Sequence, residues 1–417
     1  MRILFISQII PWPPDAGPKV KTWNVLRYLK ESGHQVVLVA FARKEEEASI
    51  PFVKEVCEEV HTISLRRSRL RDIFYWLRSE LRERPFTIER DDLPEMRQLV
   101  QTLLSEGQFD IVHADQIPMA QFLFQGNLPS SLNRVDTRPN LVFDAHNATW
   151  TIFDRMSDNV PWLIRPLVRR EAKKIRDYEG RLLCSVNHTM AVSEQDRQAL
   201  LAAARMLNGC QPYRAPGPVS VIPIATDTGK VLPVNHHPGS KKILTLGTLH
   251  YPPNADGIRW FMQKVFPLVL SREADTTLIV VGKNPPKDFI NAAAKSEGKI
   301  QVMGYVPELR PFYEEADVVV VPVRAGGGMR VRILEAFTLG VPVVTTTVGL
   351  EGIQAADKED VMIADSPQDF SDAVCRILCE PKLQKQLAQN SRQVVENRYD
   401  WRVVLDQMGQ VYGESAE

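Results

Sequence analysis

A loop of three consecutive glycines near residue 327 separates a short apolar run from an expected helix. Its members are Gly326, Gly327 and Gly328. Glycine lets the backbone turn tightly and brings amide N–H groups close to a ligand. The helix should begin near Met329, and its unpaired N–H groups and positive dipole end favour an anion. Arg330 and Arg332 add guanidinium groups that match phosphate oxygens. These residues predict a cradle for a diphosphate.

One carboxylate accompanies this cradle. Glu335 follows Arg332 by three residues, which places both on one face of the expected helix. A carboxylate beside a phosphate site suits two neighbouring ribose hydroxyls. The alternative is a glycine-rich surface loop followed by an ordinary Arg–Glu surface pair. The residues by themselves leave both interpretations open.

Alternating apolar runs and amphipathic stretches predict the elements that must position the cradle. Apolar runs with few polar positions suit strands covered on both faces. We expect strands over residues 2–6, 35–40, 60–64, 109–113, 141–145, 189–192, 242–246, 276–281, 300–303, 317–322, 342–346 and 361–363. Helices are expected over residues 22–32, 255–271, 309–315, 330–339, 368–379, 382–397 and 401–412. Strands separated by helices predict parallel sheets, whose ligands bind beyond the carboxyl ends of the strands.

A Pro- and Gly-containing stretch over residues 208–240 is the expected linker. We therefore predict an α/β protein with two doubly wound domains, residues 1–210 and 218–399, and a helix at 400–417 that packs back on the first domain. The length of 417 residues agrees with two or three domains. Lys plus Arg (51) equals Asp plus Glu (51), so no overall field favours nucleic acid.

The cysteines and apolar runs exclude other classes. Five scattered cysteines without CxxC spacing predict neither a disulfide framework nor a zinc site, and they fit a cytoplasmic protein. The first apolar run is expected to be a strand rather than a signal peptide, and no run approaches the ~20 apolar residues of a membrane-spanning helix. No Asp-x-Asp motif is present, so we expect no metal and no cofactor besides a nucleotide sugar.

The run GGGMRVRILEAFTLGVPVVTT closely resembles the donor motif of the group 1 (family four) retaining glycosyltransferases, in their glycine-rich donor-loop subgroup. The segments ESGHQVVLV, FDIVHAD, FDAHN, MAVSEQD, VIPIATDT, LGTLHYPPNADG and VMGYVPELRPFYEEADVVVVP follow in the family's order along nearly the whole chain. The resemblance implies the GT-B fold, with two Rossmann-like domains facing across a cleft. It implies metal-independent transfer of a sugar from a nucleotide diphosphate donor to a glycan or lipid-linked acceptor, with retention, in cell-surface polysaccharide or glycolipid synthesis.

The resemblance also assigns roles to single residues. Glu335 would bind the nucleotide ribose, and Arg330 and Arg332 would stabilise the departing diphosphate. Further donor contacts are implied for Gly17, Gly247, Thr248, Tyr305, Val306, Gly326, Gly327, Gly328 and Met329. As alternatives, Gly17 is a plain turn, and Tyr305 and Val306 are core residues.

Several positions depart from the family pattern. Gly327 stands where many relatives have a glutamate that contacts the donor sugar, and Ala16 replaces the first glycine of a pair. His250 and Asn254 occur where relatives often have an Arg and a Lys–Gly pair. The resemblance therefore leaves the sugar contacts and the identity of the donor open.

His146 follows an expected strand at its carboxyl end, and the resemblance places it against the transferring sugar as a catalytic group. A lone histidine is otherwise more often structural or solvated. Candidates for acceptor contact are Lys19, His113, Asp115 and Asn147.

Residues 65–84 carry seven arginines and three acids around apolar residues at helical spacing. Such a helix can lie on an anionic membrane. The alternative is a packing helix with a solvated polar face. Residues 162–176 repeat the pattern more weakly.

Two other functions stay open at this stage. One is a nucleotide-sugar epimerase with a similar fold, and the other is a catalytically silent sugar-nucleotide-binding protein. A dehydrogenase is disfavoured, because no GxGxxG follows the first strand of either half.

Overall fold

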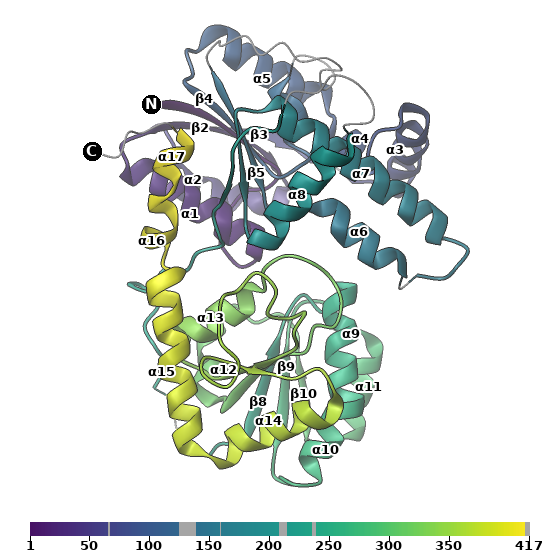
Figure 1. Cartoon of the computed structure of the whole chain (residues 1–417), viewed down its shortest axis with the longest axis vertical. Helices are drawn as coiled ribbons and strands as arrows, with labels where there is room; N and C mark the ends of the chain where they lie inside the picture. Colours follow the sequence, from purple (N-terminus) through teal and green to yellow (C-terminus); the bar gives the residue numbers. More distant parts are fainter. Residues whose placement is uncertain (66, 125–138, 159, 208–214, 236–238, 413–417) are drawn as a thin grey trace. The chain divides into compact units, whose positions relative to one another are not determined.

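The computed structural model describes residues 1–65, 67–124, 139–158, 160–207, 215–235 and 239–412 (Figure 1). Contacts divide the chain into two compact units. The first comprises Met1–Ala225 and Val404–Glu417, and the second comprises Thr226–Val403. Every helix in the described part of the chain is too short or too polar to span a bilayer.

The first unit is built on a seven-stranded parallel sheet with the order β3-β2-β1-β4-β5-β6-β7. The strands are β1 (Arg2–Ser7), β2 (Gln35–Ala42), β3 (Glu59–Ser64), β4 (Ile111–Asp115), β5 (Asn140–Ala145), β6 (His188–Ala191) and β7 (Val219–Val221). The central strands are buried along almost their whole length. They are covered on both faces, which explains why their sequences read as continuous apolar runs.

Helices lie on both sides of this sheet (Figure 1). They are α1 (Gly17–Glu31), η1 (Lys44–Ser49), α2 (Ile50–Lys54), α3 (Arg69–Arg82), α4 (Phe86–Asp91), α5 (Pro94–Glu106), η2 (Ala120–Leu123), α6 (Thr149–Asp158), α7 (Arg165–Ser185), α8 (Glu194–Met206) and α17 (Met408–Tyr412). Helix α1 begins five residues before the expected start, because Pro18 in its first turn lacks an N–H that would be unpaired there anyway. The end of the chain contacts this sheet, where the Tyr412 hydroxyl lies 2.8 Å from His113 Nδ1.

The second unit has a six-stranded parallel sheet with the order β10-β9-β8-β11-β12-β13. Its strands are β8 (Lys242–Leu246), β9 (Thr277–Val281), β10 (Ile300–Met303), β11 (Val318–Val321), β12 (Val343–Thr345) and β13 (Met362–Ile363). Its helices are α9 (Pro252–Trp260), η4 (Phe261–Val265), α10 (Phe266–Leu270), α11 (Lys287–Lys295), α12 (Arg310–Glu315), α13 (Val331–Leu339), α14 (Pro367–Cys379) and α15 (Pro381–Arg398), and α16 (Trp401–Asp406) spans the boundary between units.

Three sequence predictions about elements need correction. The expected linker contains β7, which pairs with β6 from Val219 onwards, and a three-residue edge strand is too short to show a periodicity. The helix expected over 255–271 consists of two α-helices, α9 and α10, that are joined by the π turn η4. The regular α-helical pattern is interrupted because Pro267 cannot donate a helical hydrogen bond. Helix α11 and, in the first unit, helices α2, α4, α5, α6 and α8 were not predicted.

Glu179 of α7 ties α7 to the start of α6. Its carboxylate accepts hydrogen bonds from the N–H groups of Thr149 (2.8 Å) and Trp150 (3.3 Å). Burial raises the pKa of Glu179 to about 8, although these N–H groups act in the opposite direction. Because the folded-state pKa lies above the ordinary value of 4.5, the native state binds the proton more tightly than the unfolded chain does. This contribution to stability is complete below the unfolded pKa and is lost as the pH rises through the folded pKa.

We therefore expect the free energy of unfolding to fall between about pH 5 and about pH 8, and Glu179→Gln to flatten that decline. Denaturant unfolding over this pH range measures the free energy of unfolding, with Glu95→Gln on the exposed face of α5 as the control. If the free energy of unfolding of Glu179→Gln fell as steeply with pH as that of the wild type, the decline would not come from Glu179.

Candidate functional site

The three glycines form the connection between β11 and α13. Gly326 has φ +115° and Gly328 has φ +80°, whereas Gly327 lies outside the positive-φ region. Only glycine adopts such angles without strain, so the first and third positions need glycine and the second does not. Helix α13 begins at Val331, with Arg330 as the residue that precedes it. The strand–glycine loop–helix arrangement predicted from the sequence is present.

Arg330 points back to this loop. Its Nη1 donates to the carbonyl oxygens of Gly327 and Gly328, both at 2.5 Å. A guanidinium that bridges two carbonyls stabilises the loop conformation. Met329, the remaining loop residue of the predicted donor set, is buried. Arg330 thus stabilises the glycine loop. Its predicted catalytic role would require a second contact, with the diphosphate.

Glu335 and Arg332 lie together on α13, where the Arg332 Nη1 pairs with a Glu335 carboxylate oxygen. Their side chains are 26% and 30% exposed, so the pair is half-buried rather than a solvated surface pair. Tyr313 of α12 is buried nearby. Burial and the negative charge of Glu335 raise the pKa of Tyr313 well above its usual range. The charge of Glu335 therefore acts on the buried, neutral Tyr313 as well as on Arg332.

The glycine loop provides an internal test. Gly326→Ala and Gly328→Ala should each strain the loop by about 1–2 kcal/mol, since alanine resists positive φ, and should weaken binding of a nucleotide sugar. Gly327→Ala is the matched control and should bind like the wild type. Titration calorimetry measures the three affinities, with the nucleotide sugar that best protects the wild-type protein against thermal unfolding. An equal loss of affinity in all three variants would show that the positive φ angles of the loop are not needed for binding.

Other predicted donor residues follow neighbouring strands of the same sheet. Gly247 and Thr248 follow β8, and the Asn254 Nδ2 donates to the Thr248 carbonyl oxygen at 3.4 Å. A Cβ on Gly282, after β9, would meet the Gly247 carbonyl oxygen at 1.9 Å, so these two turns pack backbone against backbone. Parallel strands end at one edge of a sheet, and this edge therefore gathers the loops after β8, β9, β10 and β11.

Tyr305 and Val306 follow β10 at this edge. Tyr305 is 59% exposed, and Val306 is half-buried. The alternative that Tyr305 is a core residue is therefore wrong. The ammonium of Lys283, which follows β9, lies 4.3 Å from the centre of the Tyr305 ring. An exposed ring of this kind offers a face on which a planar base can stack.

The first unit carries a second set of polar residues at the carboxyl ends of β1, β4 and β5. His146 Nε2 lies 2.6 Å from Asp115 Oδ1. The other oxygen of Asp115 accepts hydrogen bonds from Ser7 Oγ (2.8 Å) and Thr22 Oγ1 (2.9 Å). Asp115 is fully buried, and His146 Nδ1 has no partner among the described residues. Asp115 thus fixes the ring of His146 and does not itself face an acceptor.

Beside this pair lies a buried ion-pair cluster that sequence reasoning missed. The Lys21 ammonium of α1 contacts the Asp144 carboxylate at the end of β5. Burial would raise the pKa of Asp144, but Lys21 and the neighbouring histidines hold that pKa well below its usual range. Ligand atoms of His113, Asp115 and Asp144 lie within 4.8 Å of one another, as they would around a metal ion. Because Lys21 already supplies a cation there, we interpret the group as an ion-pair network.

The predicted acceptor role of His113 needs correction. Its ring is completely buried, stacks on Phe5 with ring centroids 4.2 Å apart, and reaches Tyr412. No surface is left for direct contact with a sugar. The only sequence signal against that role was its position inside a continuous apolar strand.

The other candidates of the first unit lie at helix starts. Gly17 is the first residue of α1, and Lys19 Nζ lies 3.8 Å from Asp15 and 3.7 Å from Glu46 carboxylate oxygens. The Asn147 side chain accepts a hydrogen bond from Thr149 Oγ1 at 3.0 Å.

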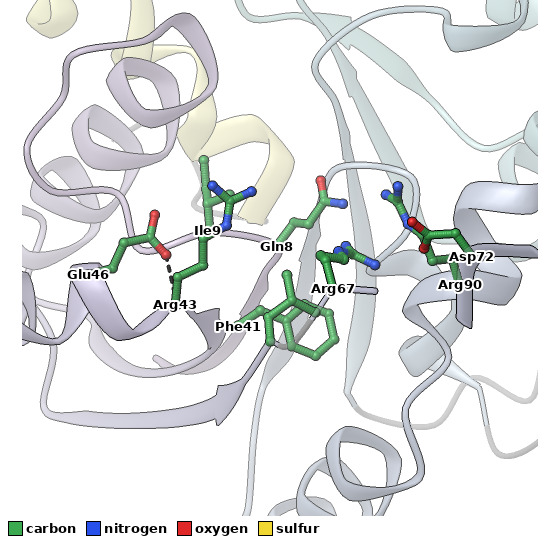
Figure 2. Close-up of a pocket in the computed structure, with 9 residues that line it drawn as sticks. Gln8, Ile9, Phe41, Arg43, Glu46, Arg67, Asp72 and Arg90 are labelled. Carbon is green, nitrogen blue, oxygen red and sulfur yellow. Dashed lines mark hydrogen bonds between the residues drawn. The ribbon is translucent and has the colours of Figure 1, made fainter. Parts of the chain in front are cut away.

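A pocket of about 330 Å³ opens at the carboxyl ends of β1, β2 and β3 (Figure 2). Its lining includes Arg43, Arg67 and Arg90, with Glu46 and Asp72 as the acids. The buried Asp91 carboxylate fixes one wall, since it accepts hydrogen bonds from Arg90 at 3.2 Å and Gln8 at 2.7 Å and pairs with Arg67 at 2.7 Å. Sequence reasoning missed this pocket, because its residues come from four separate segments. Asp91 pairs with both Arg67 and Arg90, and Glu46 and Asp72 add two acids, so the pocket carries charges of both signs.

Comparisons with known proteins agree with this architecture. Residues 16–206 match the family model of the "Glycosyl transferase 4-like domain", and residues 240–380 match that of "Glycosyl transferases group 1". The chain is 22% identical over 427 residues to an uncharacterised 44.6 kDa protein in the cps region of Klebsiella pneumoniae, with 97% of this chain and 98% of that protein covered.

Two solved structures have a similar fold. Sucrose-phosphate synthase from Thermosynechococcus elongatus has a TM-score of 0.71 at 16% identity, with 99% of each chain covered. Anabaena Alr3699/HepE in complex with UDP-glucose has a TM-score of 0.65 at 14% identity, with 100% of each chain covered. With two parallel Rossmann-like sheets and family matches in both halves, the chain belongs to the group 1 glycosyltransferases and has the GT-B fold.

Proposed function

We propose that the protein transfers a hexose from a nucleotide diphosphate sugar to an acceptor, with retention and without a metal ion. The observation that carries this proposal is the edge of the second sheet. The glycine loop, the turn at Gly247 and the exposed Tyr305 all follow strands that end there. Such an edge is the usual binding place of nucleotides in α/β sheets. The structure of Anabaena Alr3699/HepE with UDP-glucose supports a nucleotide-sugar donor.

Each part of the donor has a proposed partner. The diphosphate lies against the N–H groups that begin α13 and against Arg332, where the helix dipole favours negative charge. Arg330 keeps the loop in the shape that presents these groups. Glu335 accepts hydrogen bonds from the ribose hydroxyls, and the base stacks on Tyr305. A glycosyl diphosphate already contains a good leaving group, so the protein mainly stabilises the charge that develops on it.

His146 is the proposed partner of the transferring sugar. Its Nδ1 has no partner among the described residues, and its Nε2 is fixed by Asp115. A ring held in this way keeps one buried, unsatisfied nitrogen in a single orientation, and such a nitrogen favours a hydrogen bond with a ligand. Gly17 and Lys19, at the start of α1, complete the proposed set on this side.

We propose that the acceptor is a glycan or a lipid-linked glycan. The pocket lined by Arg43, Arg67 and Arg90 together with Glu46 and Asp72 offers polar partners for its hydroxyl groups. The relative in the cps region supports a role in building a cell-surface polysaccharide.

Thermal unfolding in the presence of UDP-, GDP-, ADP- and dTDP-sugars tests the proposal. A donor at 100 times its dissociation constant adds ~2.7 kcal/mol to the free energy of unfolding. NMR analysis of the product then gives its class and its anomeric configuration. A new glycosidic bond with the donor's configuration supports the proposal, and an isomerised nucleotide sugar would identify an epimerase instead. Stabilisation without turnover would identify a silent binding protein.

A further inference from the structure

Helix α3 turns its apolar side to solvent and its polar side to the protein, which is the reverse of an ordinary surface helix. Its apolar residues recur at helical spacing, which usually marks the side that packs on the core. Here that side is 51–87% exposed, and its members are Leu70, Ile73, Phe74, Leu77 and Leu81. The buried residue of α3 is the polar Ser79.

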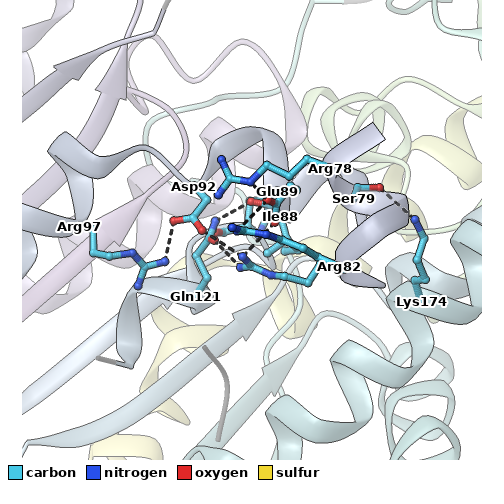
Figure 3. Close-up of polar contacts among 11 residues, drawn as sticks. Arg78, Ser79, Arg82, Ile88, Glu89, Asp92, Arg97, Gln121 and Lys174 are labelled. Atoms are coloured by element: carbon cyan, nitrogen blue, oxygen red, sulfur yellow. Dashed lines mark hydrogen bonds and ion pairs between the residues drawn. The ribbon is translucent and has the colours of Figure 1, made fainter. Parts of the chain in front are cut away.

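The polar side of α3 is the side attached to the protein (Figure 3). Arg78 pairs with the buried carboxylate of Glu89 in α4, and Arg82 reaches the same group at 3.2 Å. On α7, Lys174 Nζ lies 3.0 Å from Ser79 Oγ and 2.8 Å from a Glu80 carboxylate oxygen. These polar contacts fix the rotation of the helix about its axis, because turning it would break two of the ion pairs of the buried Glu89 and the contacts of the buried Lys174 with Ser79 and Glu80. The exposure of the apolar side therefore follows from the packing.

The connection between α6 and α7 and the first turn of α7 carry a second exposed apolar group on the same unit. Its residues are 44–75% exposed and comprise Trp162, Leu163, Ile164 and Leu167. Helix α7 starts at Arg165 and reaches α3 through Arg170, 2.8 Å from Glu80, and through Lys174. We term these residues and the exposed apolar residues of α3, which lie on two helices in contact with each other, the apolar face. So many large exposed apolar groups on one part of a protein mark an interaction surface.

The charges around the apolar face are mainly positive. Arg69, Arg71 and Lys173 are exposed and form no ion pair with described residues. The acid of α3 nearest to α7, Glu80, is already neutralised by Arg170 and Lys174. Interfaces between proteins are depleted in charged residues at their centre, whereas amphipathic helices on bilayers combine basic residues with exposed Leu, Phe and Trp.

We propose that the apolar face docks the protein on an anionic lipid bilayer. The apolar side chains enter the boundary between headgroups and acyl chains, and the arginines contact lipid phosphates. Trp76 and Trp162, both exposed, suit the headgroup level. The inference stands apart from the proposed transfer reaction, because it uses none of the residues assigned to the donor or to His146.

Vesicle flotation of the full chain tests this docking. We expect the protein to float with vesicles of phosphatidylcholine and phosphatidylglycerol at ~0.1 M salt, and to be released by ~1 M salt. Phe74→Asp/Leu77→Asp should bind these vesicles at least ~tenfold more weakly, since it removes two exposed apolar groups that enter the bilayer on docking. Arg69→Ala/Arg71→Ala should bind ~30-fold more weakly. The matched control, Leu232→Asp/Ile290→Asp, replaces two exposed apolar residues of the second unit and should float like the wild type.

Three outcomes would overturn the docking surface. The first is a wild-type protein that stays with the unbound fraction, and the second is unchanged flotation of Phe74→Asp/Leu77→Asp. The third is a dimer in light scattering that the same variant dissociates, because the face would then bind a second copy. Thermal protection by the nucleotide sugar is measured in parallel on every variant. It checks folding, and it separates a failure of the docking surface from a failure of the proposed transfer reaction.

Discussion

Replacement of Asp115 by alanine is expected to lower the rate of sugar transfer about a hundredfold, with little change in nucleotide affinity. The Asp115 carboxylate is buried and fixes the His146 ring through Nε2, while Ser7 and Thr22 fix the carboxylate. Without it the ring can rotate, and a misplacement of about 1 Å at a reacting centre can cost ~100-fold. The rate with the identified donor, measured as kcat and KM, is the readout.

Two further variants separate positioning from a loss of folding. His146→Ala should lose as much as Asp115→Ala, and the double variant should lose no more, because both substitutions remove one coupled unit. Asp115→Asn keeps the side-chain volume and should retain more stability than the alanine variant. Asp110→Ala, which removes the carboxylate bonded to the Arg2 N–H just before β4, is the control and should keep its rate. Additive losses in the double variant would disprove the coupling.

Replacement of Glu335 by alanine is expected to weaken donor binding by about 1.5–3 kcal/mol, the usual contribution of a hydrogen bond to a charged group. This corresponds to a roughly 10- to 150-fold higher Kd. The fold should survive, because the Glu335 side chain is 26% exposed and contributes little to the core. Calorimetric titration with the stabilising nucleotide sugar measures the change.

Glu314→Ala is the matched control for this substitution. Glu314 is also a helical glutamate of the second unit and pairs with Arg310 at 2.9 Å. Its loss should leave donor affinity at the wild-type level. A Glu335→Ala protein that binds the donor as tightly as the Glu314→Ala protein would remove Glu335 from the proposed site.

Much of the fold was predictable from local patterns. The strands of both sheets have continuous apolar sequences because helices cover both of their faces, and all strands except β7 overlap an expected one. The glycine loop was predictable because backbone geometry at Gly326 and Gly328 depends on the residue itself. Interactions within one residue's backbone or within one helical turn, such as that of Arg332 with Glu335, can be recognised from neighbouring residues in the sequence.

Tertiary structure decided which distant side chains meet. Asp115 and His146 are 31 residues apart, and Lys21 and Asp144 are 123 apart. No periodicity encodes these pairs, because the order of the strands in the sheet brings them together. The burial of His113 and the arginine pocket have the same origin.

The sequence by itself determined the alternation of strands and helices, the phosphate-suited loop and the amphipathic character of residues 65–84, since each depends on neighbours along the chain. Which side of α3 faces the protein was decided only by the tertiary structure. A helical period defines an apolar side, but the buried Glu89 of α4 and the buried Lys174 of α7, which is 95 residues from Ser79, bind the polar side and turn the apolar side outward.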